Sequence, residues 1–199
     1  LDFSVILPVF LGTDSCAFER SINSVLDQTI PPSEILIIVD GPINSSLKKA
    51  IDDYLNIKSI KAIFLETNQG SGIARSNGVI NAKFDLIALM DSDDIAINNR
   101  FEKQLPFFIN ADYDVVGGWI EEFILHPGDL NRIRKVPILH EDIIEYSKWR
   151  SPINNVTIMF AKNAYFRAGG YNEFRYYEDY ALIIKMILSG SRVYNIPEV

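Results

Sequence analysis

Cysteine is almost absent from this sequence, with Cys16 alone among 199 residues. A single thiol excludes an intrachain disulfide and a cysteine zinc cluster, and it fits a reducing compartment in which it packs as a structural side chain. Apolar runs are short as well, because those such as residues 86–90 have the length of a strand and not the roughly 20 residues of a membrane-spanning helix. We therefore expect a cytoplasmic protein that does not cross a bilayer.

Positive charge is also scarce. The 19 lysines and arginines are outnumbered by 26 aspartates and glutamates, which gives a net charge of -7. Proteins that bind the nucleic-acid backbone usually carry a basic face, so we expect no nucleic-acid partner. The hydrophobic share of 48% is ordinary for a folded domain. We expect one domain over residues 1–199 and, because the sequence stops directly after Glu198-Val199, a missing C-terminal extension.

The first half of the chain, about residues 1–98, alternates short β-branched runs with segments of helical periodicity. Strands are predicted at residues 3–7, 34–39, 60–65 and 86–90. Ser71 is expected to cap the third of the intervening helices. Because the predicted strands are continuously apolar, both faces of their sheet should be buried. The sequence thus predicts an α/β fold with a Rossmann-like, mostly parallel central sheet and helices on both faces.

The second half, about residues 99–199, loses this regular alternation. Helices are predicted at residues 99–108, 141–149, 162–168 and 178–188, and strands at 115–123 and 156–160. A polar stretch, residues 126–137, lies between them. We expect this mixed half to hold a second substrate.

A polar or glycine-containing segment follows most strands of the first half. The four segments are Pro8-Val9-Phe10, Asp40-Gly41, Asn68-Gln69-Gly70 and Asp91-Ser92-Asp93-Asp94. Ligands of an open parallel sheet bind outside the carboxyl ends of its strands. The four segments should therefore converge on one rim of the sheet and form a binding site there.

The acidic segment after the fourth strand is the sharpest of these signals. Asp91, Asp93 and Asp94 repel one another, and a bound divalent cation is the usual compensation. Their oxygen ligands suit Mg²⁺ or Mn²⁺, with substrate phosphates completing the coordination shell. The alternative is a solvated acidic turn that caps the next helix. An EF-hand is excluded, since Ala96 replaces its glycine and Ile95 replaces an oxygen ligand.

Two further segments are candidates for binding an anion or a base. Residues 70–75 are a glycine-rich helix start with Arg75 one turn in, which suits a phosphate. They do not match a dinucleotide fingerprint, because Arg75 stands where the third glycine belongs. The alternative is a plain helix cap with Arg75 in an ion pair. Asp40, taken alone, is equally a turn-forming residue before Gly41.

Glu178 and Asp179 open the helix predicted at residues 178–188. The helix dipole and the free amides at that end favour ionised carboxylates. A charged helix start is the plain interpretation of this pair. If a metal cluster lies nearby, the pair becomes the leading candidate for a general base.

In their order along the chain, these segments resemble the family 2 glycosyltransferases, which have the GT-A fold. The matching segments are residues 4–10, 38–41, 68–78 and 89–94, followed by Asn154, Phe160, Gly169-Gly170-Tyr171 and Glu178-Asp179-Tyr180. The resemblance implies an inverting transfer of a sugar from a nucleotide-diphosphate sugar, most often a UDP-sugar, to an acceptor hydroxyl. It also implies Mn²⁺ or Mg²⁺ as cofactor and a saccharide or lipid-linked saccharide as acceptor.

The resemblance assigns roles residue by residue. The nucleotide-sugar would contact Pro8, Val9, Phe10, Asp40, Arg75, Asp91 and Ser92. Asp40 would hold the nucleobase, and Asp93 with Asp91 would hold the ribose and the metal-diphosphate region, joined by Asp94 as a metal ligand. Asp179 would be the catalytic base, with Glu178 holding the acceptor or a backbone amide.

Family members of this kind mostly serve bacterial surface polysaccharide synthesis, which places the protein at the inner face of the membrane. Two other classes remain open from the sequence. One is a non-catalytic nucleotide-sugar-binding protein, which would need neither Asp93 nor Asp179. The other is a metal-dependent phosphohydrolase that uses the acidic segment.

Overall fold

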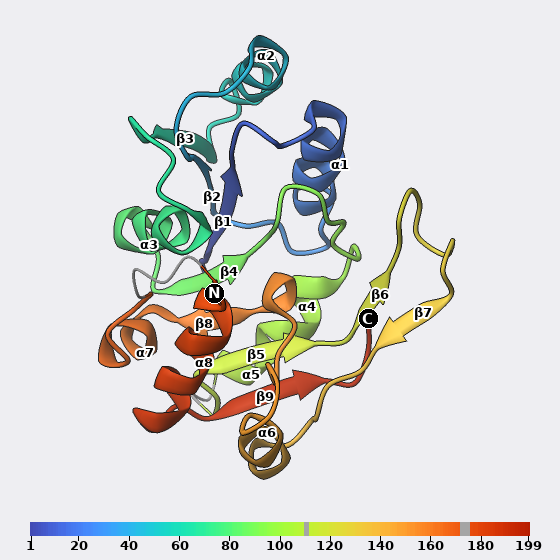
Figure 1. The fold of residues 1–199 in the computed structure, drawn as a ribbon, viewed down its shortest axis with the longest axis vertical. Coiled ribbons are helices and arrows are strands. Elements are labelled where there is room, and N and C mark those ends of the chain that lie inside the picture. The colour runs from blue at the N-terminus through green and yellow to red at the C-terminus, as the bar shows by residue number, and fades with distance from the viewer. Residues whose placement is uncertain (110–111, 172–175) are drawn as a thin grey trace.

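The computed structural model describes residues 1–109, 112–171 and 176–199. A seven-stranded sheet runs through both halves of the chain, with helices on either face (Figure 1). The strand order is β3-β2-β1-β4-β8-β5-β9. The expectation of a mostly parallel α/β sheet is confirmed, because only β8 runs antiparallel to the strands beside it in this sheet. No helix in the described part of the chain is long and apolar enough to cross a membrane.

The first half follows the predicted strand-helix alternation. Its strands are β1 (Ser4–Val9), β2 (Glu34–Val39), β3 (Ile60–Phe64) and β4 (Leu86–Leu89), and its helices are α1 (Ser15–Leu26), α2 (Ser45–Tyr54) and α3 (Ser71–Asn81). Asp14 begins α1, because its Oδ1 accepts a hydrogen bond from the Ala17 amide at 2.8 Å. The expected cap of α3 is wrong: Gly70 is the N-cap, with a φ of 94°, and Ser71 is the first helical residue.

The second half contains more and shorter elements than the sequence predicts. They are α4 (Arg100–Gln104), α5 (Pro106–Ile109), β5 (Val115–Gly118), β6 (Ile120–Glu122), β7 (Arg132–Arg134), α6 (His140–Tyr146), a 3-10 helix η1 (Asn155–Thr157), β8 (Met159–Ala161), α7 (Lys162–Arg167), α8 (Glu178–Leu188) and β9 (Val193–Ile196). β8 pairs antiparallel with both β4 and β5, and β9 pairs parallel with β5.

Several predicted boundaries in this half are wrong. The helix expected at residues 99–108 is two helices, because Pro106 has no amide hydrogen with which to continue α4. The strand expected at 115–123 divides into β5 in the main sheet and β6, which pairs with β7 in a separate hairpin. The strand expected at 156–160 starts as η1, and the strand β8 begins only at Met159.

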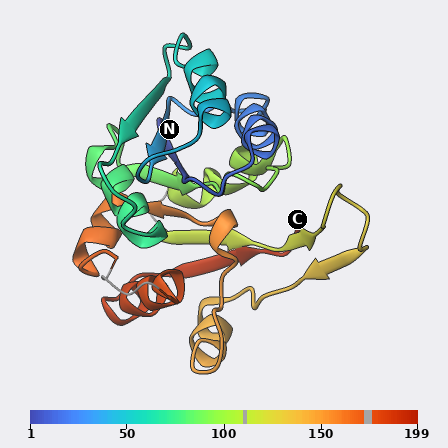
Figure 2. The ribbon, with the colours of Figure 1, turned by 45° about the horizontal axis from the view of Figure 1, so that its top comes forward.

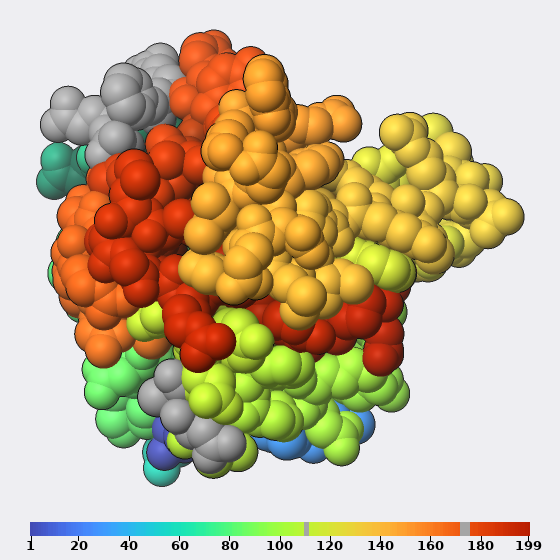
Figure 3. Space-filling view, turned by 90° about the horizontal axis from the view of Figure 1, so that it is seen from below, coloured from blue at the N-terminus to red at the C-terminus, as the bar shows by residue number. Residues whose placement is uncertain are grey.

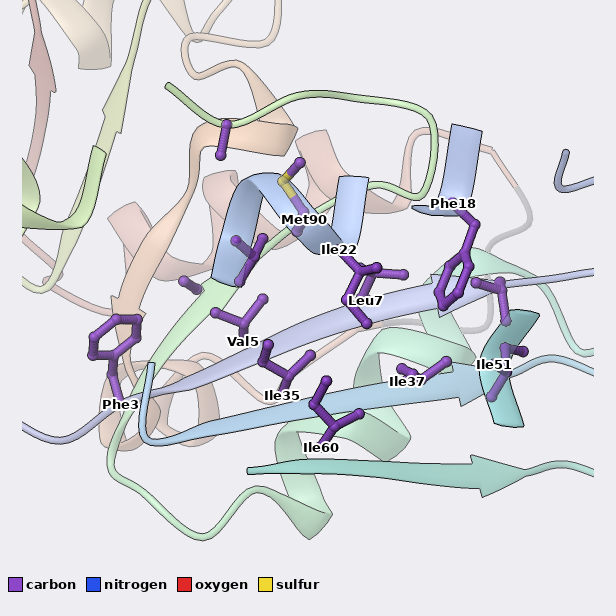
Figure 4. Packing of buried hydrophobic residues seen from close by; sticks show 14 of the residues in the cluster. Phe3, Val5, Leu7, Phe18, Ile22, Ile35, Ile37, Ile51, Ile60 and Met90 are labelled. Carbon is purple, nitrogen blue, oxygen red and sulfur yellow. The ribbon is translucent and has the colours of Figure 1, made fainter. Parts of the chain in front are cut away.

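Alternate residues of the central strands feed two hydrophobic cores. Val5 and Leu7 of β1, like Ile35 and Ile37 of β2, face the core beneath α1 and α2 (Figure 4). The intervening Ile6, Leu36 and Ile38 belong to the core on the opposite face, shared with residues of α3, α7 and α8. This alternation explains why the strands are continuously apolar, since both of their faces are covered.

The hairpin formed by β6 and β7 projects away from the body of the protein (Figures 1 and 2). The space-filling view shows it extending beyond the helices that cover the sheet (Figure 3). Its connecting loop is held by Asp129, whose carboxylate accepts hydrogen bonds from the amides of Ile124, Leu125 and His126. The loop therefore has a defined shape although it is exposed.

Candidate active site

The carboxyl ends of β1, β2, β3 and β4 and the segments after them meet at one edge of the sheet, as expected, although β1 includes Pro8 and Val9 and so ends later than the predicted residue 7. They line a cavity of about 340 Å³, which is the smaller of two cavities beside the acidic segment. Ser71, Ala74 and Arg75 of α3 close one side of this smaller cavity. The strand-end segments contribute Pro8, Val9, Phe10, Asp40, Asn68, Gly70, Asp91, Ser92 and Asp93. All predicted nucleotide-sugar-binding residues are therefore brought together in one place.

Asp40 is buried at the end of β2 and fixes the loop that follows β3. The amide of Gln69 donates to its Oδ1 at 2.8 Å, and the amide of Gly70 donates to its Oδ2 at 2.9 Å. Gly41 has a φ of 84°, and a Cβ there would lie 2.5 Å from the Asn68 nitrogen. The turn-forming role left open by the sequence is thus present. A carboxylate has about four acceptor positions, so Asp40 can still accept a hydrogen bond from a ligand.

Arg75 forms the wall of the smaller cavity opposite the strand ends. Its side chain is 8% exposed, and its Nη2 lies 2.6 Å from Oδ1 of Asp91. Its Nη1 lies 3.5 Å from Oε1 of Glu178. Burial lowers the pKa of the Arg75 guanidinium. Asp91, Tyr171 and Glu178 together raise this pKa by more than burial lowers it, so the net shift is upward. The ion pair that the sequence left open is present, and it faces the cavity.

The acidic segment after β4 places its side chains in different surroundings. Asp91 pairs with Arg75, and Ser92 is buried with its hydroxyl oxygen 3.3 Å from that of Thr13. Asp93 is exposed and lines the smaller cavity. Only Asp91 and Asp93 of the three predicted metal ligands therefore share this cavity.

Asp94 points to the other side of the segment. Burial raises the pKa of its carboxyl to about 6, with Asp91 and Asp93 adding to the rise and Arg100 opposing it. Burial also lowers the pKa of Arg100 to about 10, while Asp91 and Asp94 raise it. Nη2 of Arg100 donates to the carbonyl of Leu89 at 3.0 Å, so this cation is fixed at the end of β4. No pattern in the sequence singled out Arg100 as a residue of this site.

The carboxylates of this segment fit a divalent cation whose coordination shell is completed by a substrate. Over residues 1–109, 112–171 and 176–199, no group of three or more His, Cys, Asp or Glu side chains is arranged to hold a metal ion. Asp91 and Asp93 nevertheless line one cavity with hard oxygen atoms. Mg²⁺ is usually bound in this way, by one or two carboxylates together with substrate phosphates and water.

Two serines of α1 and Gln28, which follows that helix, hold the segment after β4 in place. The Ser21 hydroxyl donates to the carbonyl of Asp91 at 2.8 Å. The Ser24 hydroxyl accepts a hydrogen bond from the amide of Ala96 at 3.0 Å. The side-chain amide of Gln28 donates to the carbonyl of Ile97 at 2.7 Å. These serines and the glutamine recur at helical spacing, which was the signal in the sequence that could have identified them.

Glu178 and Asp179 open α8, as predicted, but they differ in their contacts. The Glu178 carboxylate accepts a hydrogen bond from the Ser71 hydroxyl and pairs with Arg75. Asp179 is half-buried, and its Oδ1 accepts from the amide of Tyr180 at 2.8 Å. Neither carboxylate is among the residues that line the two cavities. Residues 172–175, which precede them, lie outside the described part of the chain.

A larger cavity of about 570 Å³ lies on the other side of Asp93. It is bounded by the segment after β4, by the ends of β5 and β9, and by the β6–β7 hairpin. Its charged lining residues include Arg20, Asp93, Asp94, Arg100 and Lys103, and its apolar ones include Ile95, Ile97, Trp119, Phe123 and Ile124. Asp93 thus borders both cavities.

Comparison with known families gives one match over most of the chain. Residues 4–175 match the model of glycosyl transferase family 2. The sequence is 38% identical over 198 residues to UDP-Gal:alpha-D-GlcNAc-diphosphoundecaprenol beta-1,3-galactosyltransferase of Escherichia coli, covering 99% of this chain and 72% of that protein.

Solved structures agree on the fold. The S. aureus TarS 1-349 complex with UDP-GlcNAc superposes with a TM-score of 0.77 at 20% identity, over 100% of this chain and 57% of that one. Mannosyltransferase PcManGT of Pyrobaculum calidifontis, in complex with GDP-Man and Mn2+, gives a TM-score of 0.75 at 14% identity, over 99% of this chain and 55% of that one. This chain therefore spans somewhat more than half of each solved chain. The predicted GT-A fold is confirmed.

Proposed function

Since this chain belongs to glycosyl transferase family 2, we propose that it moves a sugar from a UDP-sugar to an acceptor hydroxyl with inversion at the anomeric carbon. The observation that carries this proposal is the convergence of four strand-end segments and Arg75 on one cavity. The relative with 38% identity is a UDP-galactose-dependent transferase, which supports a UDP-sugar as the donor.

The nucleotide of the donor occupies the smaller cavity in this proposal. Asp40 accepts a hydrogen bond from the uracil imide N–H, in addition to the two backbone amides that it already holds. Pro8, Val9 and Phe10 form the apolar side of the nucleotide site, and Ser92 lies beside them. Arg75 supplies a positive charge for the diphosphate.

Asp91 and Asp93 would hold Mn²⁺ or Mg²⁺ together with the donor diphosphate, and Asp94 stands behind them as a further acidic group. The cation supplies neutralisation of the charge that develops on the departing diphosphate. Ser21 and Ser24 of α1, with Gln28 just after that helix, keep the backbone of residues 91–97 fixed for that purpose.

Asp179 acts as the general base in this proposal. It lies in the first turn of α8, where the helix dipole favours the carboxylate form. It accepts a hydrogen bond from a backbone amide and forms no salt bridge among the described residues, so a lone pair remains for the proton of an acceptor hydroxyl. The hydroxyl then attacks the anomeric carbon from the side opposite the diphosphate, which inverts the configuration.

The larger cavity receives the part of the acceptor that does not react. It shares Asp93 with the donor cavity, and it offers both an apolar wall and the cations Arg20 and Lys103. That combination suits a sugar attached to a diphosphate and a lipid, the type of acceptor named for the Escherichia coli relative. We accordingly propose work on a lipid-linked saccharide of surface polysaccharide synthesis, with peripheral association at the inner face of the membrane.

Product analysis tests the proposed reaction. The chain is incubated with Mn²⁺, a radiolabelled UDP-sugar and a synthetic saccharide-diphosphate-lipid, and the products are separated by chromatography. Label on the acceptor, in the anomeric configuration opposite to that of the donor, is the expected result. Inorganic phosphate as the product would indicate a phosphohydrolase instead. An unchanged donor, despite bound UDP, would indicate a non-catalytic nucleotide-sugar-binding protein.

A further inference from the structure

We propose that Glu178 is a positioning residue that acts through Arg75 and couples occupancy of the donor cavity to the orientation of the helix start that carries Asp179. This inference rests on the proposed function, because it assigns the donor to the smaller cavity and the base to α8. It adds a physical link between the donor cavity and the start of α8, which the proposed function does not include.

The link consists of one guanidinium shared by two carboxylates from opposite halves of the chain. Arg75 Nη2 lies 2.6 Å from Oδ1 of Asp91, and Nη1 lies 3.5 Å from Oε1 of Glu178. The side chains of Arg75 and Glu178 are 8% and 13% exposed, so water screens this pair little. Asp91 belongs to the donor cavity and Glu178 directly precedes the proposed base.

Packing at the start of α3 keeps Glu178 in this position. The Ser71 hydroxyl donates to the same Oε1 that pairs with Arg75. A Cβ added at Gly72 would lie 3.0 Å from Cγ and 3.2 Å from Cβ of Glu178, so the absence of a side chain at residue 72 leaves the room that Glu178 occupies. The first turns of α3 and α8 are therefore in direct contact through Glu178.

The first turn of α8 is also held by the Tyr180 hydroxyl, which donates to the carbonyl of Ser147. Its N-cap, Tyr177, has a φ of 60°, a left-handed conformation that a non-glycine residue adopts only when its surroundings hold it there. Tyr176 and Tyr177 are both largely exposed and cannot supply that restraint by burial. The contacts of Glu178, the next residue, with Ser71 and Arg75 contribute to this restraint, and Asp179 follows in the same turn.

Filling the donor cavity changes the partners of Arg75. In the structure, the shortest contact of the Arg75 guanidinium is with Asp91. Nε of Arg75 is buried without a hydrogen-bond partner among the described residues. When Asp91 turns to a bound cation, its attraction for the guanidinium weakens, and the donor diphosphate becomes the second anionic partner of Arg75. Arg75 is then held between the diphosphate and Glu178, which tightens the start of α8 when the donor is in place.

Hydrogen exchange followed by mass spectrometry tests this coupling without relying on turnover. Exchange of the α8 amides, residues 178–188, is measured with and without Mn²⁺ and UDP at concentrations that calorimetry shows to be saturating for each protein. In the wild type we expect bound UDP to slow exchange in the first turn of α8. Glu178→Gln should lose this slowing although its site is filled. Glu141→Gln, the same change in the first turn of α6, should retain it.

Gly72→Ala provides a second, independent variant, because its methyl group displaces Glu178 and leaves the carboxylate in the chain. It should reproduce the loss of slowing seen in Glu178→Gln. Turnover gives a further readout: at saturating donor, Glu178→Gln should lower kcat by about 10-fold to 100-fold, as a displaced catalytic group does, and retain the pH dependence of the wild type. A base, by contrast, would lose the acidic limb of that profile.

The possible failures are distinguishable. A wild type that does not bind UDP with Mn²⁺ contradicts the proposed function itself. A wild type that binds UDP without slowed exchange in α8, or a Glu178→Gln variant that keeps the slowing, contradicts the coupling alone. Loss of the acidic limb in Glu178→Gln would make Glu178 the base and would equally overturn its role as a positioning residue.

Discussion

The two halves of the chain contribute strand ends to different cavities. The parallel strands β1, β2, β3 and β4 end at the smaller cavity, whereas β5 and β9 of the second half end at the larger one. Between these two sets lies β8, which runs in the opposite direction. Asp93 follows β4 and borders both cavities, so it stands where the two sets of strand ends come closest.

The halves also differ in how their polar groups are held. In the first half, Asp40 and the acidic segment are fixed by backbone hydrogen bonds to neighbouring loops and to α1. In the second half, Asp179 stands at a helix start that Glu178 connects to Ser71 and Arg75 of the first half. This difference suggests a preformed donor site and an adjustable catalytic group, which substitutions in each half can test.

The largest effect is expected in the second half, at Asp179. Asp179→Asn keeps the size of the side chain and removes its basicity, so transfer should fall by about 10²-fold to 10⁴-fold. UDP affinity in Mn²⁺ should stay close to that of the wild type, because Asp179 does not line the smaller cavity. Steady-state kinetics and calorimetry measure the two quantities separately.

Asp142→Asn is the matched control for this variant, since Asp142 also lies in the first turn of a helix, α6. It should leave both transfer and UDP affinity unchanged. If Asp179→Asn turns over at the wild-type rate, the base lies elsewhere and the contrast between the two halves loses its catalytic meaning.

A smaller effect, on both stability and binding, is expected at Asp40 in the first half. Asp40→Asn puts an amide group in place of one oxygen, so one of the buried amides of Gln69 and Gly70 loses its acceptor. Such a loss costs about 1–3 kcal/mol in the free energy of unfolding. UDP should also bind more weakly, because the loop that lines the cavity is loosened, while the Mn²⁺ requirement remains.

Chemical denaturation and calorimetry check this prediction, with Asp53→Asn on the exposed face of α2 as the control. Unchanged UDP affinity in Asp40→Asn, together with a normal free energy of unfolding, would remove Asp40 from both of its roles.

Two glycines permit a direct comparison of packing in the halves. A Cβ at Gly78 of α3 would lie 2.5 Å from Cγ2 of Ile6, whereas a Cβ at Gly118 of β5 would lie 3.4 Å from its nearest neighbour, the carbonyl oxygen of Glu198. Gly78→Ala should destabilise by about 1–3 kcal/mol through overpacking, offset in part by helix propensity of up to about 1 kcal/mol. Gly118→Ala should have the smaller effect. Equal free energies of unfolding would contradict this description of the α3–β1 contact.

The smallest effect concerns pH and the amino end of β2, far from the cavities. Burial raises the pKa of Glu34, but the Lys83 amide, Lys61 and Ser4 lower it more, so the net shift is below its ordinary value of 4.5. Glu34 therefore stabilises the folded state at any pH above its ordinary pKa. This stabilisation is lost as the pH falls through the lowered pKa of the folded state. In thermal unfolding, the wild type should lose more stability than Glu34→Gln on acidification from about pH 6 to about pH 3, and an equal loss in both proteins would argue against this role.

The sequence predicted the first half more closely than the second, and the reason is physical. The bounds of β2 were predicted without error because six buried residues, five of them apolar, end at a turn. Strand β7 was missed because its three residues are all exposed, and only pairing with β6 makes them extended. Strand β9 was missed because its alternate residues are only half-buried and it pairs with a strand about 75 residues earlier in the chain.

The candidate site shows the same division. The convergence of Pro8, Asp40, Arg75 and Asp91 followed from the rule for parallel strand ends. The support from Ser21 and Gln28, and the contact of Glu178 with Arg75, depend on how helices pack in three dimensions. Side-chain partners of that kind cannot be predicted from the periodicity of one segment.

Calorimetric titration of UDP into the wild type and Asp93→Ala, each in Mn²⁺ and in chelator, tests the central claim most directly, because Asp93 borders both cavities. We predict that the wild type binds UDP at least about 10-fold more tightly in Mn²⁺ than in chelator, a difference of about 1.4 kcal/mol. We predict that Asp93→Ala binds UDP equally in both solutions. The same UDP affinity for both proteins in both solutions would contradict the metal-dependent donor site.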